Sequence, residues 1–409
     1  MMRTVPFDST LAFLREGYPF IASRCEASGA DVLTTRLALH PVTLLRGAEA
    51  ARVFYDGRHL TRQGAMPALV QHLLQDEGSV QSLDGAAHHR RKKMFLSLMG
   101  PDAMDRLGAL FEAEWDHALA RLHDSGRVRL DHLSRVVLTR AALRWCGIGL
   151  EAVGVPRLTT ELSLMIDQVA RPGPANWYAR WRRRGTERWA SELVEQVRAG
   201  GLTPPPESPL AVLAAHTEDG DLLPPRVAAV EILNLLRPLL AVSRFIEFAA
   251  VALVRHPQWR DTFAAGDERD LEPFAQEVRR FFPFFPAVPG RVRAPFRIQD
   301  HDFRIGDRVI LDLYGTCHDR RTFPDPDSFR PERFRGWSWQ EDPFTLIAQG
   351  AGDPEEDHRC PGEGSTVALL ERAVRLLSRS GLTMPPQDLS IPLNRFPAAP
   401  RSGVVLAGL

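Results

Sequence analysis

The stretch EILNLLRPLLAVSRFIEFAAVAL, at positions 231–253, constrains the fold most, because its apolar residues predict one long helix. Arg237 and Pro238 interrupt this helix near its middle. A proline inside a helix removes a backbone donor, so the carbonyl of Asn234 loses its helical partner at a cost of roughly 3 kcal/mol. An arginine among leucines costs on the order of several kcal/mol more, unless an anionic group meets it. Two unfavourable residues side by side therefore indicate a functional requirement at this point.

Helical patterns also dominate the rest of the chain. Strand patterns are short, and the one linker-like run, LTPPPESP at 202–209, is too short to separate independent domains. We therefore predict a mainly α single domain with a minor β portion, spanning 1–409. The long irregular stretch 316–364 predicts a functional segment. Apolar residues recur at helical spacing in AMDRLGALFEAEWDHALARL, RVAAVEILNLL, FAQEVRRFF and STVALLERAVRLLSRSG, the last ending in a glycine placed as a C-cap, and the strand patterns are RVRLDHL, FRIQDHDFRIGDRVILDLYG and GVVLAGL.

Composition narrows the class of protein. Basic and acidic residues balance at 51 each among 409, so nothing in the charge predicts a nucleic acid partner. The N-terminus lacks the apolar run and cleavage site of a signal peptide, and no segment reaches about 18 uninterrupted apolar residues, so we expect no membrane span. The cysteines show no CxxC and no regular spacing, which argues against a disulfide scaffold or zinc site and predicts a cytoplasmic protein. They are Cys25, Cys146, Cys317 and Cys360.

Cys360 lies in a glycine-rich loop directly before a predicted helix, in FTLIAQGAGDPEEDHRCPGEGSTVALLERA. The free amides of a helix N-terminus predict a lowered thiol pKa, and the alternative is a buried structural cysteine. The segment resembles the cysteine-ligand loop of the cytochromes P450, the haem-thiolate enzymes, in which a Phe and glycines precede a His-x-Cys-x-Gly core. The matching residues are Phe344, Gly350, Gly352, His358, Cys360 and Gly362.

Two further motifs make this resemblance specific. QEVRR supplies the family's Glu-x-x-Arg at Glu277 and Arg280, and FRPERF supplies its Pro-Glu-Arg-Phe at 331–334. The resemblance implies that Glu277, Arg280 and Arg333 form a buried ion-pair network that supports the cysteine loop. It covers essentially the whole chain, and it implies the cytochrome P450 fold with haem between the long central helix and that loop.

The resemblance implies haem b, iron protoporphyrin IX, as cofactor and Cys360 as the thiolate ligand of its iron. An axial thiolate pushes electron density onto iron and favours O–O cleavage. The two haem propionates need cations, and His88 and Lys92 lie four apart on one helical face at the family's propionate-binding point. His358 is a third candidate and Arg62 a fourth. The neighbouring Arg90, Arg91 and Lys93 are interpreted as a solvated basic face.

The Arg-Pro pair resembles one branch of the family, the fatty-acid peroxygenases. An ordinary oxygen-activating member carries an acid followed by a threonine on the central helix, and Arg237 and Pro238 stand in place of such a pair here. DLYGTCHD and RVFYDGRHLTRQGAMP resemble the same branch. This implies that a long-chain fatty acid pairs its carboxylate with Arg237 and uses that carboxylate as the acid–base group for hydrogen peroxide, without a redox partner protein. The alternative is an arginine bonded to helix-terminal carbonyls.

Gln81 bears on the reaction outcome. In this branch, the position is commonly Gln in hydroxylating members and His in members that decarboxylate fatty acids to terminal alkenes. A histidine can serve as a proton donor and an amide cannot, so Gln81 predicts hydroxylation at the α or β carbon. The chain departs from the branch in the insertion DPEED, in Gln75 where a pocket Phe is expected, and in Ala287 where a bulky residue is expected.

Three other functions stay open at this point. A fatty acid decarboxylase would share the carboxylate site. A conventional monooxygenase would need a reductase and dioxygen, and the missing acid–threonine pair argues against it. A haem-binding sensor without turnover would carry the same Cys360 loop.

Overall fold

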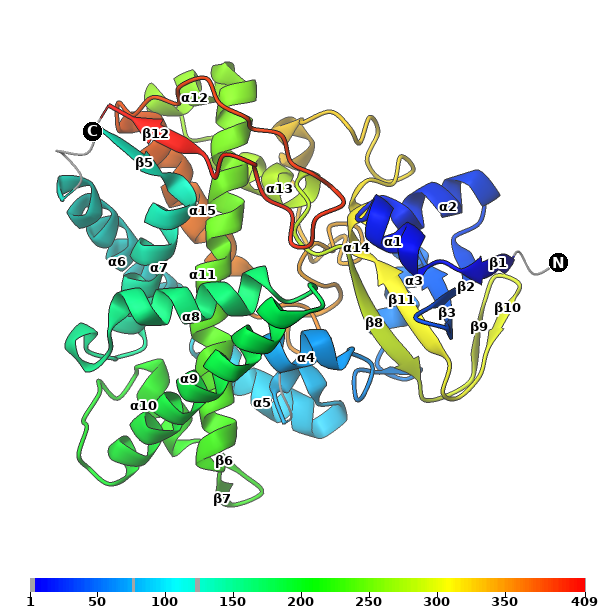
Figure 1. The fold of residues 1–409 in the computed structure, drawn as a ribbon, viewed down its shortest axis with the longest axis horizontal. Helices are drawn as coiled ribbons and strands as arrows, with labels where there is room; N and C mark the ends of the chain where they lie inside the picture. Colours follow the sequence, from blue (N-terminus) through cyan, green and yellow to red (C-terminus); the bar gives the residue numbers. More distant parts are fainter. Residues whose placement is uncertain (1–3, 76–77, 122–125, 409) are drawn as a thin grey trace.

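A helical half and a sheet half lie side by side in the computed structural model (Figure 1), which describes residues 4–75, 78–121 and 126–408. Helix α11 (Pro225–Arg255) runs through the helical half as the longest element, and it continues across Pro238 without a break. It packs against α7 (Leu130–Trp145), α9 (Pro174–Arg198) and α15 (Glu363–Arg379). The predicted long apolar helix is thus confirmed, and burial on every side explains its composition.

The other helices of the helical half surround α11 (Figure 1). The predicted mainly helical class is confirmed. The end of the predicted helix at Leu122 and the last residue, Leu409, lie outside the described residues. The bounds are α4 (Ala68–Leu74), α5 (Gly85–Ser97), α6 (Pro101–Ala120), α8 (Val155–Asp167), α10 (Pro209–Ala215), α12 (Pro257–Ala264) and α13 (Leu271–Phe281), with 3-10 turns at Val80–Ser82, Leu150–Ala152 and Pro331–Phe334.

The sheet half is built on one six-stranded sheet, in the order β1-β2-β3-β11-β8-β4. Its central pair, β3 and β11, is parallel, and β11 is antiparallel to β8 on its other side. Sequence patterns missed β1 to β4 and β8, because these short strands lack a clean alternation. The bounds are β1 (Thr4–Asp8), β2 (Val32–Leu37), β3 (His40–Leu45), β4 (Leu60–Thr61), β8 (Ala287–Val292) and β11 (Arg308–Asp312), with α1 (Thr10–Glu16), α2 (Phe20–Ser28), α3 (Ala48–Tyr55) and α14 (Leu313–Cys317) beside the sheet.

All three predicted strand segments contain shorter strands than expected. In RVRLDHL only β5 (Arg127–Arg129) is a strand, and α7 begins at Leu130. In RVILDLYG the strand ends at Asp312, whose carboxylate accepts a 2.7 Å hydrogen bond from the amide of Gly315 and so begins α14. The other short strands are β6 (Thr217–Glu218), β7 (Asp221–Leu222), β9 (Phe296–Ile298), β10 (His301–Phe303) and β12 (Val405–Ala407). Across the described ranges, no helix is both long and apolar enough to cross a membrane.

Candidate active site

The Cys360 loop is folded back on itself before α15. The amide of Cys360 donates a 2.9 Å hydrogen bond to the carbonyl of Gln349. Gly350 has φ +95°, and a Cβ there would lie 2.8 Å from the carbonyl oxygen of His358. Only glycine therefore permits this close approach of the two loop strands, and the approach fixes the position of the Cys360 sulfur.

The predicted lowering of the Cys360 pKa is wrong for the protein by itself. Burial raises the pKa of this thiol, and the backbone amide of Gly362 opposes the increase only in part. Desolvation of the thiolate outweighs the helix N-terminus because the loop lies between packed elements. A cationic metal at the sulfur would reverse this balance, since a coordinating thiol loses its proton.

A buried ion-pair network lies below the cysteine loop. Arg279 bonds Glu363 at 2.5 Å and the side chain of Gln349 at 2.8 Å. Glu363 also pairs with Arg359, at 2.7 Å. The backbone of Gln349 holds the Cys360 amide, so this network ties α13 to both ends of the loop. Sequence analysis missed Arg279, although it directly precedes the motif residue Arg280.

The three motif residues expected to form a network come together. Glu277 and Arg280 are fully buried and lie 2.7 Å apart. Arg333 lies 3.3 Å from Glu277, and the amide of Arg330 donates to the same carboxylate at 2.7 Å. Arg280 also donates to the carbonyl of Cys317 at 3.0 Å. The irregular stretch 316–364 is therefore anchored to α13 by buried charges.

Three of the four expected propionate cations gather beside the cysteine loop. The ring of His88 stacks on His358 with centroids 4.0 Å apart, and His358 lies 3.9 Å from Asp84. Lys92 is buried and donates to the carbonyl oxygens of Asp357 and Arg359, the latter at 2.8 Å. Burial lowers the pKa of Lys92 to about 8. The Lys92 ammonium thus spans the DPEED insertion and the residue before Cys360.

Arg62, the fourth candidate, joins that cluster through Asp84, whose carboxylate accepts a 3.3 Å hydrogen bond from the Arg62 amide. Its guanidinium stacks over Phe54 and Tyr55, 4.3 and 5.0 Å from the ring centroids. It donates to the carbonyl of Pro289 at 3.0 Å. Arg62 is therefore held by the sheet half, on the strand side of the site.

The interpretation of Arg91 as part of a solvated basic face is wrong. Arg91 is buried and pairs with Glu218 at 2.6 Å and with Glu231 at 2.5 Å. The inner face of α5 meets the N-terminal half of α11, so Arg91 points inward, whereas Arg90 and Lys93 lie on the outer face. Sequence spacing on α5 could not identify a carboxylate partner on another helix.

Arg237 is a buried cation without an ion pair among the described parts of the chain. The residue is 4% exposed. It donates to the side-chain oxygen of Asn234 at 2.8 Å and, at 3.5 Å, to the carbonyl of Leu73 near the end of α4. Burial, and secondarily the charge of Arg183, lower the pKa of Arg237 to about 9. The alternative hypothesis was an arginine bonded to helix-terminal carbonyls, and the Leu73 carbonyl is such a group. One long hydrogen bond, however, does not compensate the buried charge of Arg237.

Asn234 links Arg237 to a chain of polar groups that sequence analysis did not predict. Its amide nitrogen donates to Glu231 at 2.7 Å and to Gln81 at 3.2 Å. Arg91, Glu231, Asn234 and Arg237 thus form one continuous buried series. The sequence signal that could have predicted this chain of contacts is the spacing of three residues, which places Glu231, Asn234 and Arg237 on neighbouring turns of one helix.

The remaining predicted positions lie on three different elements. Pro238 is exposed although its neighbours on α11 are buried, as expected of a residue that faces a ligand space. Gln75 ends α4 and is half-buried, and Ala287 begins β8 and packs on the core between the sheet and α2.

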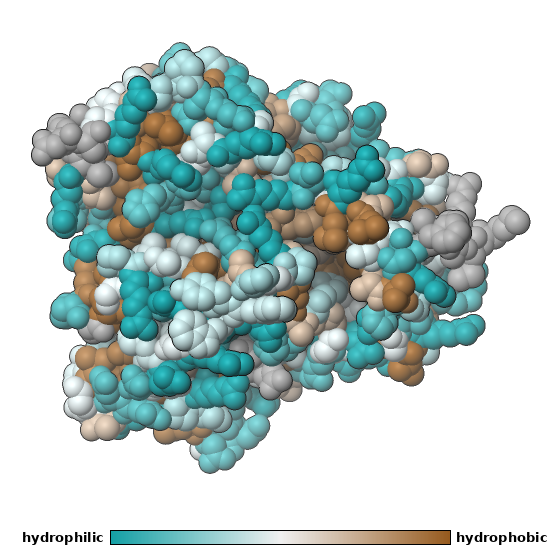
Figure 2. Space-filling view, viewed as in Figure 1, coloured by the Kyte–Doolittle hydropathy of each residue, from teal (hydrophilic) through white to brown (hydrophobic). Residues whose placement is uncertain are grey.

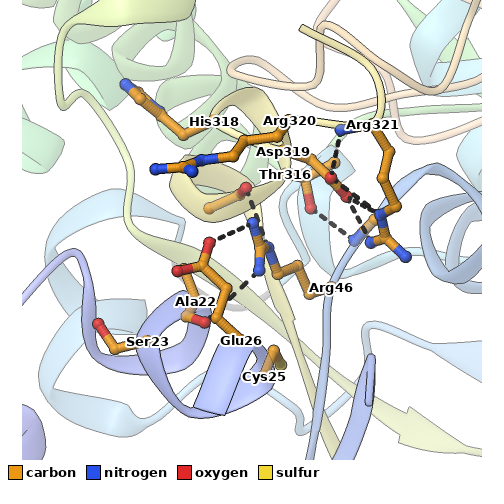
Figure 3. Close-up of polar contacts among 12 residues, drawn as sticks. Ala22, Ser23, Cys25, Glu26, Arg46, Thr316, His318, Asp319, Arg320 and Arg321 are labelled. Atoms are coloured by element: carbon orange, nitrogen blue, oxygen red, sulfur yellow. Dashed lines mark hydrogen bonds and ion pairs between the residues drawn. The ribbon is translucent and has the colours of Figure 1, made fainter. Parts of the chain in front are cut away.

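A hollow of about 560 Å³ opens elsewhere, on the sheet half beside α2. Figure 3 shows that its charged side chains face one another. Arg46 pairs with Glu26 at 2.9 Å, and Arg321 pairs with Asp319 and Asp31 at 2.5 and 2.7 Å. These charges are mutually neutralised, so the hollow lacks the unpaired group that marks the Arg237 site.

The donors near Cys360 fit haem. The described residues contain no group of three or more His, Cys, Asp and Glu side chains that could hold a metal ion. A single thiol beside buried basic side chains suits a prosthetic group that brings its own ring nitrogens and two anionic propionates.

The comparisons with known proteins agree with this arrangement. A family model described as Cytochrome P450 matches residues 271–371. Human 25-hydroxyvitamin D-1 alpha hydroxylase, mitochondrial, is 28% identical over 134 residues, which cover 27% of this chain and 26% of that protein. The chain therefore aligns with only about a quarter of the length of this curated relative. Solved structures extend the match over the whole chain.

The chain belongs to the cytochrome P450 family, and it forms a single-domain cytochrome P450 fold with haem as the cofactor. Within the family it is similar to two CYP152 proteins. P450EX alpha (CYP152N1) with myristic acid is 38% identical, with a TM-score of 0.94 and coverage of 100% of this chain and 98% of that one. P450SP alpha (CYP152B1) in complex with (R)-ibuprophen is 40% identical, with a TM-score of 0.94 and 98% of both chains covered. A variant of cytochrome P450 OleT in complex with arachidonic acid is 31% identical, with a TM-score of 0.94 and coverage of 100% and 98%.

Proposed function

We propose that the protein is a peroxygenase that uses hydrogen peroxide to hydroxylate long-chain fatty acids at the α or β carbon, with 1–409 as one catalytic domain. The observation that carries the proposal is Arg237, a buried cation that forms no ion pair within the described ranges. A substrate carboxylate is the anion that would complete its coordination. Structures similar over the full chain were solved with myristic acid and arachidonic acid, which supports this class of ligand.

The carboxylate would accept two charge-assisted hydrogen bonds from the guanidinium of Arg237, each contributing on the order of 1.5–3 kcal/mol. It would then stand beside Pro238, where other family members carry an acid. From there it would take a proton from hydrogen peroxide and return it as O–O cleavage proceeds. The haem supplies the redox chemistry when bound, with Cys360 as its thiolate ligand.

Holding the carboxylate decides which carbon reacts. The α and β carbons lie next to the anchored group, and the remaining chain would bind along apolar surface at about 0.8 kcal/mol per buried methylene. Gln81 hydrogen-bonds Asn234 at 3.2 Å and cannot serve as an acid, which supports hydroxylation over decarboxylation to an alkene. His88, Lys92, His358 and Arg62 are the residues we propose for the haem propionates.

The proposal includes no redox partner protein, because the substrate carboxylate replaces the proton-delivery pair that dioxygen activation requires. It also places the protein in the cytoplasm, which the four free cysteines support.

The Arg237→Ala variant tests the carboxylate site. We expect haem incorporation and the haem-thiolate carbon monoxide spectrum to persist, while peroxide-driven turnover of a long-chain fatty acid falls by a factor of roughly 10² to 10⁴. The turnover of Arg237→Lys, which keeps the charge but loses the planar guanidinium, should lie between that of the unmodified protein and that of Arg237→Ala. The methyl ester of the same acid should be a very poor substrate of the unmodified protein. Equal turnover of acid and ester would overturn the proposal.

The same assay separates the alternatives when it contains hydrogen peroxide and no electron donor. A reductase-dependent monooxygenase and a non-catalytic haem sensor would both give no product. A decarboxylase would give the terminal alkene as main product, which gas chromatography distinguishes from hydroxy acids. Cys360→Ala is the negative control, because it removes the thiolate and should abolish the thiolate-type spectrum.

A further inference from the structure

The first half of α9 carries an unusual exposed stripe. Trp177 and Trp181 are 65% and 62% exposed, and neighbouring Tyr178 is 47% exposed. Buried aromatic residues are common in protein cores, but adjacent exposed tryptophans on one helix are not explained by folding. We define the aromatic–basic stripe as Trp177, Arg180, Trp181, Arg184 and Arg188.

Helical spacing places the whole stripe on one face of α9. Its members follow one another at i, i+3, i+4, i+7 and i+11, which is the repeat of one helical face. The opposite face of the same helix is buried and includes Ala179, Arg183 and Thr186. The stripe therefore faces away from the core.

The charge of this segment is strongly positive. Residues 174–188 contain five arginines and a single acidic residue, Glu187. Glu187 lies 2.7 Å from the guanidinium of Arg183 and so compensates a buried charge. Within the part of the chain that the structure describes, Arg180, Arg184 and Arg188 form no ion pair. The stripe thus combines three uncompensated cations with two exposed indoles.

Hydropathy alone does not mark this surface. The face drawn in Figure 2 is mostly teal and pale over α8 and α9, with brown atoms gathered elsewhere. Trp and Tyr lie near the middle of the hydropathy scale, yet they are the residues that settle at the boundary between water and lipid. Arginine next to them adds attraction to anionic headgroups.

The stripe lies close to the Arg237 site. The side chain of Asn176, at the start of α9, donates to the carbonyls of Leu69 on α4 and Gln168 after α8, at 3.3 and 2.8 Å. The carbonyl of Leu73, also on α4, is the backbone contact of Arg237. Helix α9 also packs against α11, the helix that carries Arg237, so the outward-facing stripe and the buried guanidinium belong to adjacent helices.

We propose that the aromatic–basic stripe of α9 docks the protein peripherally on the surface of an anionic lipid bilayer. The two indoles would lie at headgroup level and the three arginines would pair with lipid phosphates. A membrane is where a free long-chain fatty acid is concentrated, so docking would bring the substrate to α4 and Arg237; this part rests on the proposed function.

Vesicle co-sedimentation of the haem-loaded protein tests the docking. We expect binding to vesicles that contain phosphatidylglycerol and weak binding to pure phosphatidylcholine vesicles. Arg184→Gln with Arg188→Gln should weaken binding about fivefold per arginine, and added salt should weaken binding of the unmodified protein. The double variant Trp177→Ser with Trp181→Ser should bind the anionic vesicles at least tenfold more weakly than the unmodified protein. The matched control is Leu39→Ser with Ile305→Ser, two residues 76% and 70% exposed on the sheet half, which should bind as the unmodified protein does.

Turnover separates docking from catalysis. The tryptophan variant should hydroxylate dispersed monomeric fatty acid at the unmodified rate and vesicle-loaded fatty acid several-fold more slowly. Vesicle binding without any fatty acid turnover would overturn the proposed function and leave the docking intact. Normal turnover with no preference for anionic vesicles would overturn the docking. A dimer in solution that the tryptophan variant dissociates, together with absent vesicle binding, would assign the stripe to a second copy of this chain and also overturn the docking.

Discussion

Arg237 is held by Asn234, one helical turn before it, through a 2.8 Å hydrogen bond. The amide group of Asn234 is oriented in turn by Glu231, and Glu231 by Arg91. A guanidinium that must meet a carboxylate at a fixed angle needs such support, because binding geometry within a fraction of an ångström decides the rate. Asn234 is therefore expected to position Arg237 rather than to contact the reacting atoms.

Asn234→Leu tests that role at the scale of one residue. The substitution keeps the branched shape of the side chain and removes its hydrogen bonds to Arg237, Glu231 and Gln81. We expect catalytic efficiency toward fatty acids to fall roughly 10- to 100-fold, the effect of one hydrogen bond to a charged group. The loss should appear in KM and in the ratio of α- to β-hydroxylated product, because the carboxylate would bind in more than one orientation. Unchanged regioselectivity together with reduced haem content would indicate a purely structural role.

At the scale of the element, α11 tolerates Pro238 because packing holds the helix on both sides of it. The carbonyl of Asn234 still lacks the amide that any other residue at position 238 would provide. Pro238→Ala should therefore raise the free energy of unfolding by about 1–3 kcal/mol, as measured by urea denaturation. Fatty-acid turnover should decrease, because the helix would close toward regular geometry beside Arg237. A variant that is neither more stable nor less active would show that the proline is incidental.

Asp312, which begins α14, gives a pH-dependent prediction at the same scale. Burial raises the pKa of Asp312 from 3.8 to about 7. Between these values the unfolded chain has released a proton that the folded chain keeps, so the contribution of this residue to stability falls as pH rises from about 4 to about 7. The stability of Asp312→Asn relative to the unmodified protein should therefore increase over that range, by about 4 kcal/mol. Denaturant unfolding of both proteins at each end of the range measures the difference, and a difference independent of pH would contradict the assignment.

At the scale of the whole molecule, Glu277 joins segments that are far apart in the sequence. Its buried carboxylate contacts Arg280, Arg333 and the amide of Arg330, and so fixes the long irregular stretch before Cys360 against α13. Removing one partner from a buried network leaves uncompensated charges and costs about 3–5 kcal/mol.

Glu277→Gln should therefore reduce both stability and the fraction of protein that shows the haem-thiolate carbon monoxide spectrum. The control is Glu272→Gln on the same helix, an exposed residue outside this network that accepts a 3.4 Å hydrogen bond from Gln276. It should behave like the unmodified protein. Normal haem incorporation in Glu277→Gln would show that the cysteine loop is held without this network.

The sequence by itself determined the helices that local periodicity predicts and the family that motif spacing identifies. The apolar run 231–253 predicted α11, the repeat after Gly362 predicted α15, and the three motifs identified the family and the Cys360 loop. Within the described residues Arg237 forms no ion pair, and the sequence indicated this because no acidic residue lies on the same helical turn.

Tertiary structure alone decided which groups meet across elements. Arg91 pairs with Glu231, 140 positions away, and Lys92 with a loop more than 260 positions away, so spacing along α5 could not reveal either partner. The parallel pairing of β3 with β11 and the raised pKa of the Cys360 thiol were equally hidden. Periodicity reports which face of an element is apolar, but the charge and solvation of a side chain depend on the elements packed against that face. For that reason Arg91 was expected in water and lies in the core.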